Sequence, residues 1–180
     1  MTEFASLGDF LAWEEGQDGR YELLKGRANP VKVDTVRRNT IRGNVFATLR
    51  KAHLSNRCHV FSLGLPLVTP SGDMLLPDVF GVCGKIDREA RQLHDATIII
   101  DVATAGTEEE TIDGRIEAYR SLPSVRHIAI VLQDEHAVDM SNRTNSGWAR
   151  NRLTGDRAMI PLSAVGMTLG MADVFDDIEN

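Results

Sequence analysis

The stretch that decides the fold is "IIIDVATAGT", which runs from Ile98 to Thr107. Three consecutive isoleucines form an unbroken β-branched run, which is typical of a buried strand. The run then ends in a carboxylate, Asp101. A charge buried without a partner costs on the order of several kcal/mol. Either a cation therefore lies beside Asp101, or its side chain leaves the core to cap the segment that follows.

Length and composition suit one compact domain. The chain has 180 residues, of which 42% are hydrophobic, so we expect a single domain over residues 1–180. We find no apolar run near the ~20 residues that span a bilayer. The N-terminal stretch is acidic and amphipathic, unlike a signal peptide. We therefore expect a cytoplasmic protein with no membrane partner. The net charge of −6 argues against a large non-specific nucleic-acid footprint, although a local basic patch is compatible with it.

The two cysteines, Cys58 and Cys83, lie far apart in the sequence and have no metal-ligand spacing. We interpret them as two buried, reduced thiols rather than as a disulfide or a site.

Periodicity predicts helices over residues 4–15, 34–54, 108–121 and 171–175. Asp34 is a plausible N-cap of the second helix, and Thr107 with Glu110 forms a plausible capping box for the third. Between the helices lie alternating or continuous apolar runs typical of strands, at 20–33, 58–62, 65–69, 74–83, 97–104, 126–133, 137–143 and 148–153. This order indicates an α/β (α+β) fold with a mixed sheet flanked by helices and extra β-hairpins.

Two aspartates close predicted strands. Asp78 follows Pro77 at the start of one strand, and Asp101 ends another. If the strands are neighbours, the two carboxylates converge at one edge of the sheet and repel each other. A divalent cation such as Mg²⁺ would relieve that repulsion, because it prefers oxygen ligands. Aspartates at strand ends are common in α/β domains, so this spacing alone does not establish a metal site.

Four segments in order carry a more specific resemblance: "FLAWEEGQDGRYELLKG", "NTIRGNVFATLRKAHL", "LLPDVFGVCG" and "TIIIDVATAGTEEETIDGRIEAYRSLPSVRHIAIV". They resemble the large bacterial family of predicted endonucleases with the PD-(D/E)xK restriction-endonuclease-like fold, long known as a domain of unknown function. The resemblance covers nearly the whole chain. It implies a restriction-endonuclease-like core and hydrolysis of DNA with Mg²⁺ (or Mn²⁺) as cofactor.

By this resemblance, Asp78 and Asp101 would bind the catalytic metal ion, and Glu22 matches a glutamate near the same site. Asp101 stands where the family usually has Glu. The sequence around Glu22 leaves a second interpretation open, in which Glu22 is an exposed strand residue that pairs with Arg20 or Arg27.

The lysine of the signature is absent. Its place two residues after the second acid is Ala103, and the family's alternative place, four residues before Tyr119, is Arg115. An arginine can stabilise phosphate charge but serves poorly as a base, because it stays protonated. The family's helix histidine is Arg38 here, and its helix aspartate is Thr111, with Asp113 out of register.

Arg37, Arg38, Arg42 and Arg50 lie within one predicted helix. Some of them therefore face outward together, either as a stripe that faces DNA or as a solvated helix face.

Two functions follow. The chain is either a Mg²⁺-dependent endonuclease, with Asp78, Asp101, Arg115 and Glu22 as its catalytic residues, or an inactive nuclease-fold module for binding or interaction. For the second function, the edge formed by the hairpins at 137–143 and 148–153 is a candidate contact of a homodimer. The second hypothesis includes a buried Asp101–Arg115 ion pair in place of the metal, because a guanidinium binds a carboxylate with two hydrogen bonds.

Overall fold

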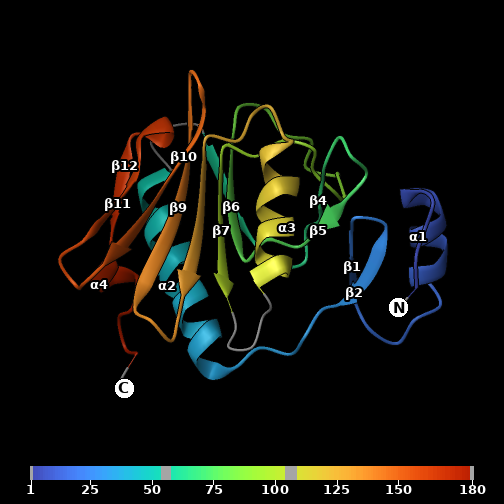
Figure 1. Ribbon diagram of the computed structural model, residues 1–180, viewed down its shortest axis with the longest axis horizontal. Helices are drawn as coiled ribbons and strands as arrows, with labels where there is room; N and C mark the ends of the chain where they lie inside the picture. The colour runs from blue at the N-terminus through green and yellow to red at the C-terminus, as the bar shows by residue number, and fades with distance from the viewer. Residues whose placement is uncertain (1, 54–57, 104–108, 179–180) are drawn as a thin grey trace.

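The structure, a computed structural model, describes residues 2–53, 58–103 and 109–178 (Figure 1). In chain order its elements are α1 (Leu7–Glu14), β1 (Tyr21–Leu24), β2 (Arg27–Pro30), α2 (Val36–His53), β3 (Cys58–Ser62), β4 (Leu67–Val68), β5 (Met74–Leu75), β6 (Val79–Cys83), β7 (Ile98–Ala103), α3 (Glu109–Arg120), β8 (His127–Leu132), β9 (Ala137–Thr144), β10 (Gly147–Thr154), β11 (Met159–Leu162), η1 (Ser163–Val165), β12 (Met167–Gly170) and α4 (Met171–Val174).

The largest sheet has six strands in the order β10-β9-β8-β7-β6-β3. β7 and β8 pair in parallel, and their connection runs through α3, as a parallel crossover requires. The remaining neighbours in this sheet pair antiparallel. The predicted mixed sheet flanked by helices is therefore confirmed.

β7 is an inner strand whose two faces both lie in the core. Ile98 and Ile100 belong to the cluster that packs against α2, whereas Ile99 belongs to the cluster that packs against α3. Figure 1 shows α2 and α3 on opposite faces of this sheet. Covered faces explain why the strand is a continuous apolar run rather than an alternating one.

α2 packs on the sheet through Ile41, Val45 and Leu49, which are fully buried and recur every four residues on one helix face. The helix begins at Val36, and Thr35 is its N-cap, because the backbone N–H of Arg38 donates to Thr35 Oγ1 at 3.1 Å. The prediction of Asp34 as the cap was wrong, because its side chain serves a different group described below.

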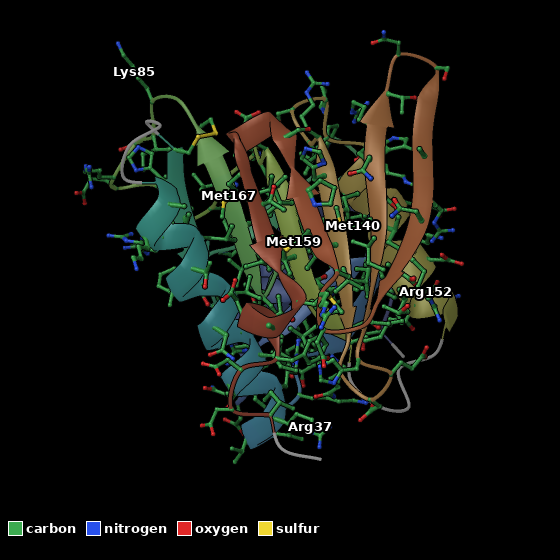
Figure 2. The ribbon with its side chains drawn as sticks, turned by 90° about the vertical axis from the view of Figure 1, so that its left-hand side faces the viewer. Arg37, Lys85, Met140, Arg152, Met159 and Met167 are labelled. Carbon is green, nitrogen blue, oxygen red and sulfur yellow. A yellow bond between two sulfur atoms is a disulfide. The ribbon has the colours of Figure 1, made fainter. Side chains whose placement is uncertain are left out.

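The two-stranded sheet of β11 and β12 covers the same face beside α2, as Figure 2 shows from the side. Met167 and Met159 lie on this hairpin, and Met159 is 54% exposed. On its inner side, the hairpin contributes Ile160, Leu162 and Leu169 to the core on that face.

A smaller antiparallel sheet, in the order β2-β1-β5-β4, lies beside the large one. α1 packs on it through Phe10 in a small core of its own. The tight β1–β2 turn uses Lys25 and Gly26, both with positive φ. This sheet brings β1, and with it Glu22, next to α3.

Cys58 and Cys83 form a disulfide. The expectation of two reduced thiols was wrong because the antiparallel register of β3 and β6 places the two residues directly opposite each other, with a Cα–Cα distance of 4.0 Å.

Among the described residues, we find no helix both long enough and apolar enough to cross a membrane.

Candidate functional site: an acidic centre closed by arginines

The two predicted acids meet where β7 nears its end and β6 begins. The backbone N–H of Asp78 donates to Asp101 Oδ1 at 3.0 Å, and the backbone N–H of Val102 donates to Asp78 Oδ2 at 2.8 Å. The side chains of Asp78 and Asp101 are 1% and 7% exposed. We call this region, with the side chains that pair with the two aspartates, the acidic centre.

On the α2 side, Asp78 is held by two arginines of that helix. Arg38 Nη2 donates to Asp78 Oδ1 and Oδ2 at 3.0 and 2.8 Å. Arg42 Nη1 donates to Oδ1 at 3.2 Å. Asp34 pairs with the same two guanidiniums, at 2.8 Å from Arg38 Nη1. Arg38 and Arg42 therefore face the protein interior, and neither belongs to the outward-facing arginines expected on this helix.

On the α3 side, Asp101 is held by Arg115 and Tyr119. Arg115 Nε and Nη2 both lie 2.9 Å from Asp101 Oδ2, and the Tyr119 hydroxyl donates to the same oxygen at 2.8 Å. Arg115 Nη2 also donates to the Tyr119 oxygen at 2.8 Å. The two residues share one helix face because they are four positions apart. The ion pair between Asp101 and Arg115 is thus present.

Glu22 points into the acidic centre from β1. Its Oε2 pairs with Arg115 Nη1, and its Oε1 accepts the backbone N–H of Leu76 at 2.6 Å. Arg27 instead pairs with Glu3 at 2.9 Å. The structure therefore brings Glu22 together with Asp78, Asp101 and Arg115, and the alternative of an exposed pair with Arg27 is not what it shows.

Four carboxylates and three guanidiniums make up the centre, for a formal charge of −1: Glu22, Asp34, Asp78 and Asp101 against Arg38, Arg42 and Arg115. Because all seven side chains are largely buried, the attraction within each pair is weakly screened. The centre is therefore close to neutral from its own residues.

Burial and neighbouring charges shift the pKa values of Asp78 and Arg115. Burial raises the pKa of the Asp78 carboxyl, the nearby Asp101 raises it further, and Arg38 lowers it in part. Burial lowers the pKa of the Arg115 guanidinium, but Asp101, Tyr119 and Glu22 outweigh burial and hold it well above its ordinary value. Arg115 consequently remains a cation and cannot accept a proton from water.

The donor set fits a divalent cation poorly. Each oxygen of Asp78 and Asp101 already accepts at least one hydrogen bond, from an arginine, a tyrosine or a backbone N–H. An octahedral ion such as Mg²⁺ needs unobstructed oxygens and several waters. Within the described ranges, no group of three or more His, Cys, Asp or Glu side chains is arranged to hold a metal ion. Arg38, Arg42 and Arg115 supply the positive charge that a metal ion would otherwise bring to Asp78 and Asp101.

Other predicted positions lie elsewhere. Asp113 pairs with Arg150 at 2.9 Å on the surface, away from the centre. Thr107 and the side chain of Glu110 lie outside the described residues, so their capping box stays a prediction. Sequence reasoning missed Asp34 and Arg42 as members of the centre. Their spacing, Asp34-Arg38-Arg42 at intervals of four, is the signal that could have found them.

Comparisons with known proteins agree with this fold. A profile of the family described as "Putative restriction endonuclease" (Uma2) matches residues 7–172. The chain is also similar to a crystal structure from Anabaena variabilis ATCC 29413, titled as a putative nuclease belonging to DUF820. The two share 14% identity at a TM-score of 0.80, over 94% of this chain and 97% of that one. No curated protein matches. Since the matched region is most of its length, this chain belongs to the Uma2 family of putative restriction endonucleases.

Proposed function

We propose that this chain uses the nuclease fold of its family as an interaction module and does not hydrolyse DNA with Mg²⁺. One observation carries the proposal: the carboxylates of Asp78 and Asp101 are each bound by arginine side chains anchored on separate helices. A buried carboxylate that is already paired gains little from a metal ion, because the ion has to break those pairs first.

Arg38 supports the proposal most directly. Its guanidinium donates to three oxygen-bearing groups, namely Asp34 Oδ1 at 2.8 Å, both oxygens of Asp78, and the carbonyl oxygen of Val102 at 3.2 Å. Carboxylate and carbonyl oxygens are the ligands that Mg²⁺ prefers. The guanidinium thus supplies, as part of the chain, the positive charge that these oxygens would otherwise take from an ion.

Arg115 supports it in a second way. Hydrolysis of a phosphodiester needs a group that activates water, and a lysine with a lowered pKa can do so. Arg115 cannot, and its three nitrogen atoms are all engaged by Asp101, Tyr119 and Glu22. The centre therefore lacks a free base as well as free metal ligands.

A second candidate function, a Mg²⁺- or Mn²⁺-dependent DNA endonuclease, is favoured by a different observation. Glu22, Asp78 and Asp101 come from three strands or strand ends and share one centre. That function requires Arg38 and Arg115 to leave the carboxylates.

Cleavage of DNA separates the two functions. Purified wild type, Asp78→Ala and the double variant Arg38→His/Arg115→Lys are incubated with supercoiled plasmid and with single-stranded DNA in Mg²⁺ or Mn²⁺. We expect no cleavage by wild type above the Asp78→Ala background, and cleavage by the double variant would show that the two arginines are the obstacle. Metal-dependent cleavage by wild type that disappears in Asp78→Ala would overturn the proposal and establish the endonuclease.

A further inference from the structure

A cavity of about 560 Å³ opens at the other end of the large sheet, where β7 and β8 begin. Thr97 directly precedes β7, and four residues along a strand separate it from Asp101, which is ~13 Å. The side chains that matter here are Thr97, Ser124, Arg126, His127, Arg143 and Ser163. We call this cavity the basic cleft.

The basic cleft contains two positive charges and no carboxylate among its lining residues. Burial lowers the pKa of the Arg143 guanidinium, and repulsion from Arg126 lowers it further. Within the described parts of the chain, the exposed Arg126 guanidinium has no carboxylate partner. Two cations that repel each other without a counter-charge favour an anion between them.

Arg143 is held in place before any ligand arrives. Its Nε donates to the carbonyl of Val125 at 2.7 Å, and its Nη2 donates to the carbonyls of Arg120 and Leu122 at 3.0 and 2.8 Å. The guanidinium also lies over the ring of Trp148, 4.5 Å from its centre. Nη1 makes no hydrogen bond to another described residue, so one donor edge of a fixed guanidinium is available to a ligand.

His127 positions the far wall of the cleft. Its Nε2 accepts the backbone N–H of Ala164 at 3.1 Å, which leaves the proton on Nδ1, 2.7 Å from Asn142 Oδ1. Ser163 Oγ lies 3.3 Å from the same Nε2. The order Ser163–His127–Asn142 is that of a hydrolytic triad, but the Ala164 N–H occupies the lone pair that would deprotonate Ser163. His127 is therefore a positioning residue: by accepting the Ala164 N–H, it holds the backbone next to Ser163 at the cavity.

We propose that the basic cleft binds a phosphate group. Arg126 and Arg143 would supply its counter-charge, and the hydroxyls of Thr97, Ser124 and Ser163 are neutral donors in the same cavity. The exposed Arg126 guanidinium can present two parallel N–H donors to two phosphate oxygens, and Arg143 adds its Nη1. This site is independent of the proposed function, since none of its residues belongs to the acidic centre.

The experiment titrates wild-type protein with inorganic phosphate by isothermal calorimetry. Arg126→Ala removes the exposed cation without touching the fixed frame of Arg143, and Arg126→Lys keeps the charge. Arg157→Ala is the matched control, because Arg157 is exposed and follows β10 at the other end of the sheet. We expect saturable binding by wild type and Arg157→Ala, about tenfold weaker binding by Arg126→Ala, and partial recovery in Arg126→Lys.

Two arms then identify the source of the phosphate. A single-stranded oligonucleotide with a 5′-phosphate is compared with the same oligonucleotide without it, and both are compared with a nucleoside monophosphate. Loss of affinity in Arg126→Ala for whichever phosphate binds supports the site. No binding of any phosphate by wild type, or binding that is equal in wild type and Arg126→Ala, would overturn it. Neither outcome depends on whether the acidic centre cleaves DNA.

Discussion

The two ends of the same sheet treat arginine in opposite ways. At the acidic centre, Arg38, Arg42 and Arg115 are bound to carboxylates from β1, β7, the segment before α2 and the residue before β6. At the basic cleft, Arg143 is bound to backbone carbonyls and an aromatic ring, and Arg126 has no carboxylate among the cleft's lining residues.

This contrast shows that the number of charges at a site says little about its ligand. What matters is whether the charges are already satisfied within the chain. The acidic centre contains four carboxylates, and each of them is paired with an arginine of the same centre. The basic cleft has fewer charged groups, but they are not neutralised, so it is the better binding site of the two.

Removing Arg115 should produce the largest effect. Arg115→Ala leaves the buried carboxylates of Asp101 and Glu22 without their cation, and loss of one partner of a buried pair costs about 3–5 kcal/mol. Urea unfolding followed by circular dichroism measures this loss. Arg50→Ala, an exposed arginine on α2, is the control and should change the free energy of unfolding by less than ~0.5 kcal/mol. Equal stability of the two variants would show that the acidic centre is not held by its ion pairs.

Tyr119→Phe should have an intermediate effect. The variant keeps the ring in the core and removes the hydroxyl that donates to Asp101 Oδ2 and accepts from Arg115. We expect a loss of about 1–2 kcal/mol in the free energy of unfolding, because a buried acceptor loses one of its donors. A change in the urea midpoint no greater than that of Arg50→Ala would contradict this contact.

Acidification should reveal the raised pKa of Asp78, with a smaller effect. A folded-state pKa above the ordinary value of 3.8 means that the stability linked to protonating Asp78 is present below that value and is lost as the pH rises through the folded pKa. The free energy of unfolding of wild type minus that of Asp78→Asn should therefore increase as the pH falls from 7 to below 3.8, which means that wild type becomes relatively more stable. A decline of this relative stability over the same pH range would contradict a raised pKa of Asp78.

The smallest effect on stability is expected at the basic cleft. Arg126→Ala removes an exposed side chain that repels Arg143 and has no carboxylate partner among the lining residues. The free energy of unfolding should stay within ~0.5 kcal/mol of wild type, while phosphate affinity falls. A large loss of stability would mean that Arg126 stabilises the fold. That result would contradict the contrast between the acidic centre and the basic cleft.

Local patterns in the sequence were enough to predict most elements of the fold. The helix predicted over residues 34–54 and the strand predicted from the run at Ile98–Ile100 are both present, as α2 and β7. These patterns depend on neighbours a few residues away, which the sequence lists directly. The disulfide was missed because Cys58 and Cys83 meet only through strand register, which is a long-range property.

The acidic centre was predictable in part, since Asp34 and Arg42 were missed. Asp78 and Asp101 stand at strand ends, and the resemblance drew attention to Glu22 and Arg115. The inward direction of Arg38 was not predictable from a helix with several arginines, because it depends on Asp78 approaching from another element. The basic cleft was invisible for the same reason, since β8, β9 and η1 meet there only in the folded chain.

Titration with Mn²⁺ shows whether arginine side chains take the place of a metal ion at the acidic centre. Wild type and Arg38→His/Arg115→Lys are titrated with Mn²⁺ and followed by calorimetry and by the electron paramagnetic resonance of free Mn²⁺, with Asp78→Ala in each background as control. We predict no Asp78-dependent binding by wild type and one Asp78-dependent site in the double variant. Binding of Mn²⁺ by wild type that is lost in Asp78→Ala would contradict the account and would make the acidic centre a metal site after all.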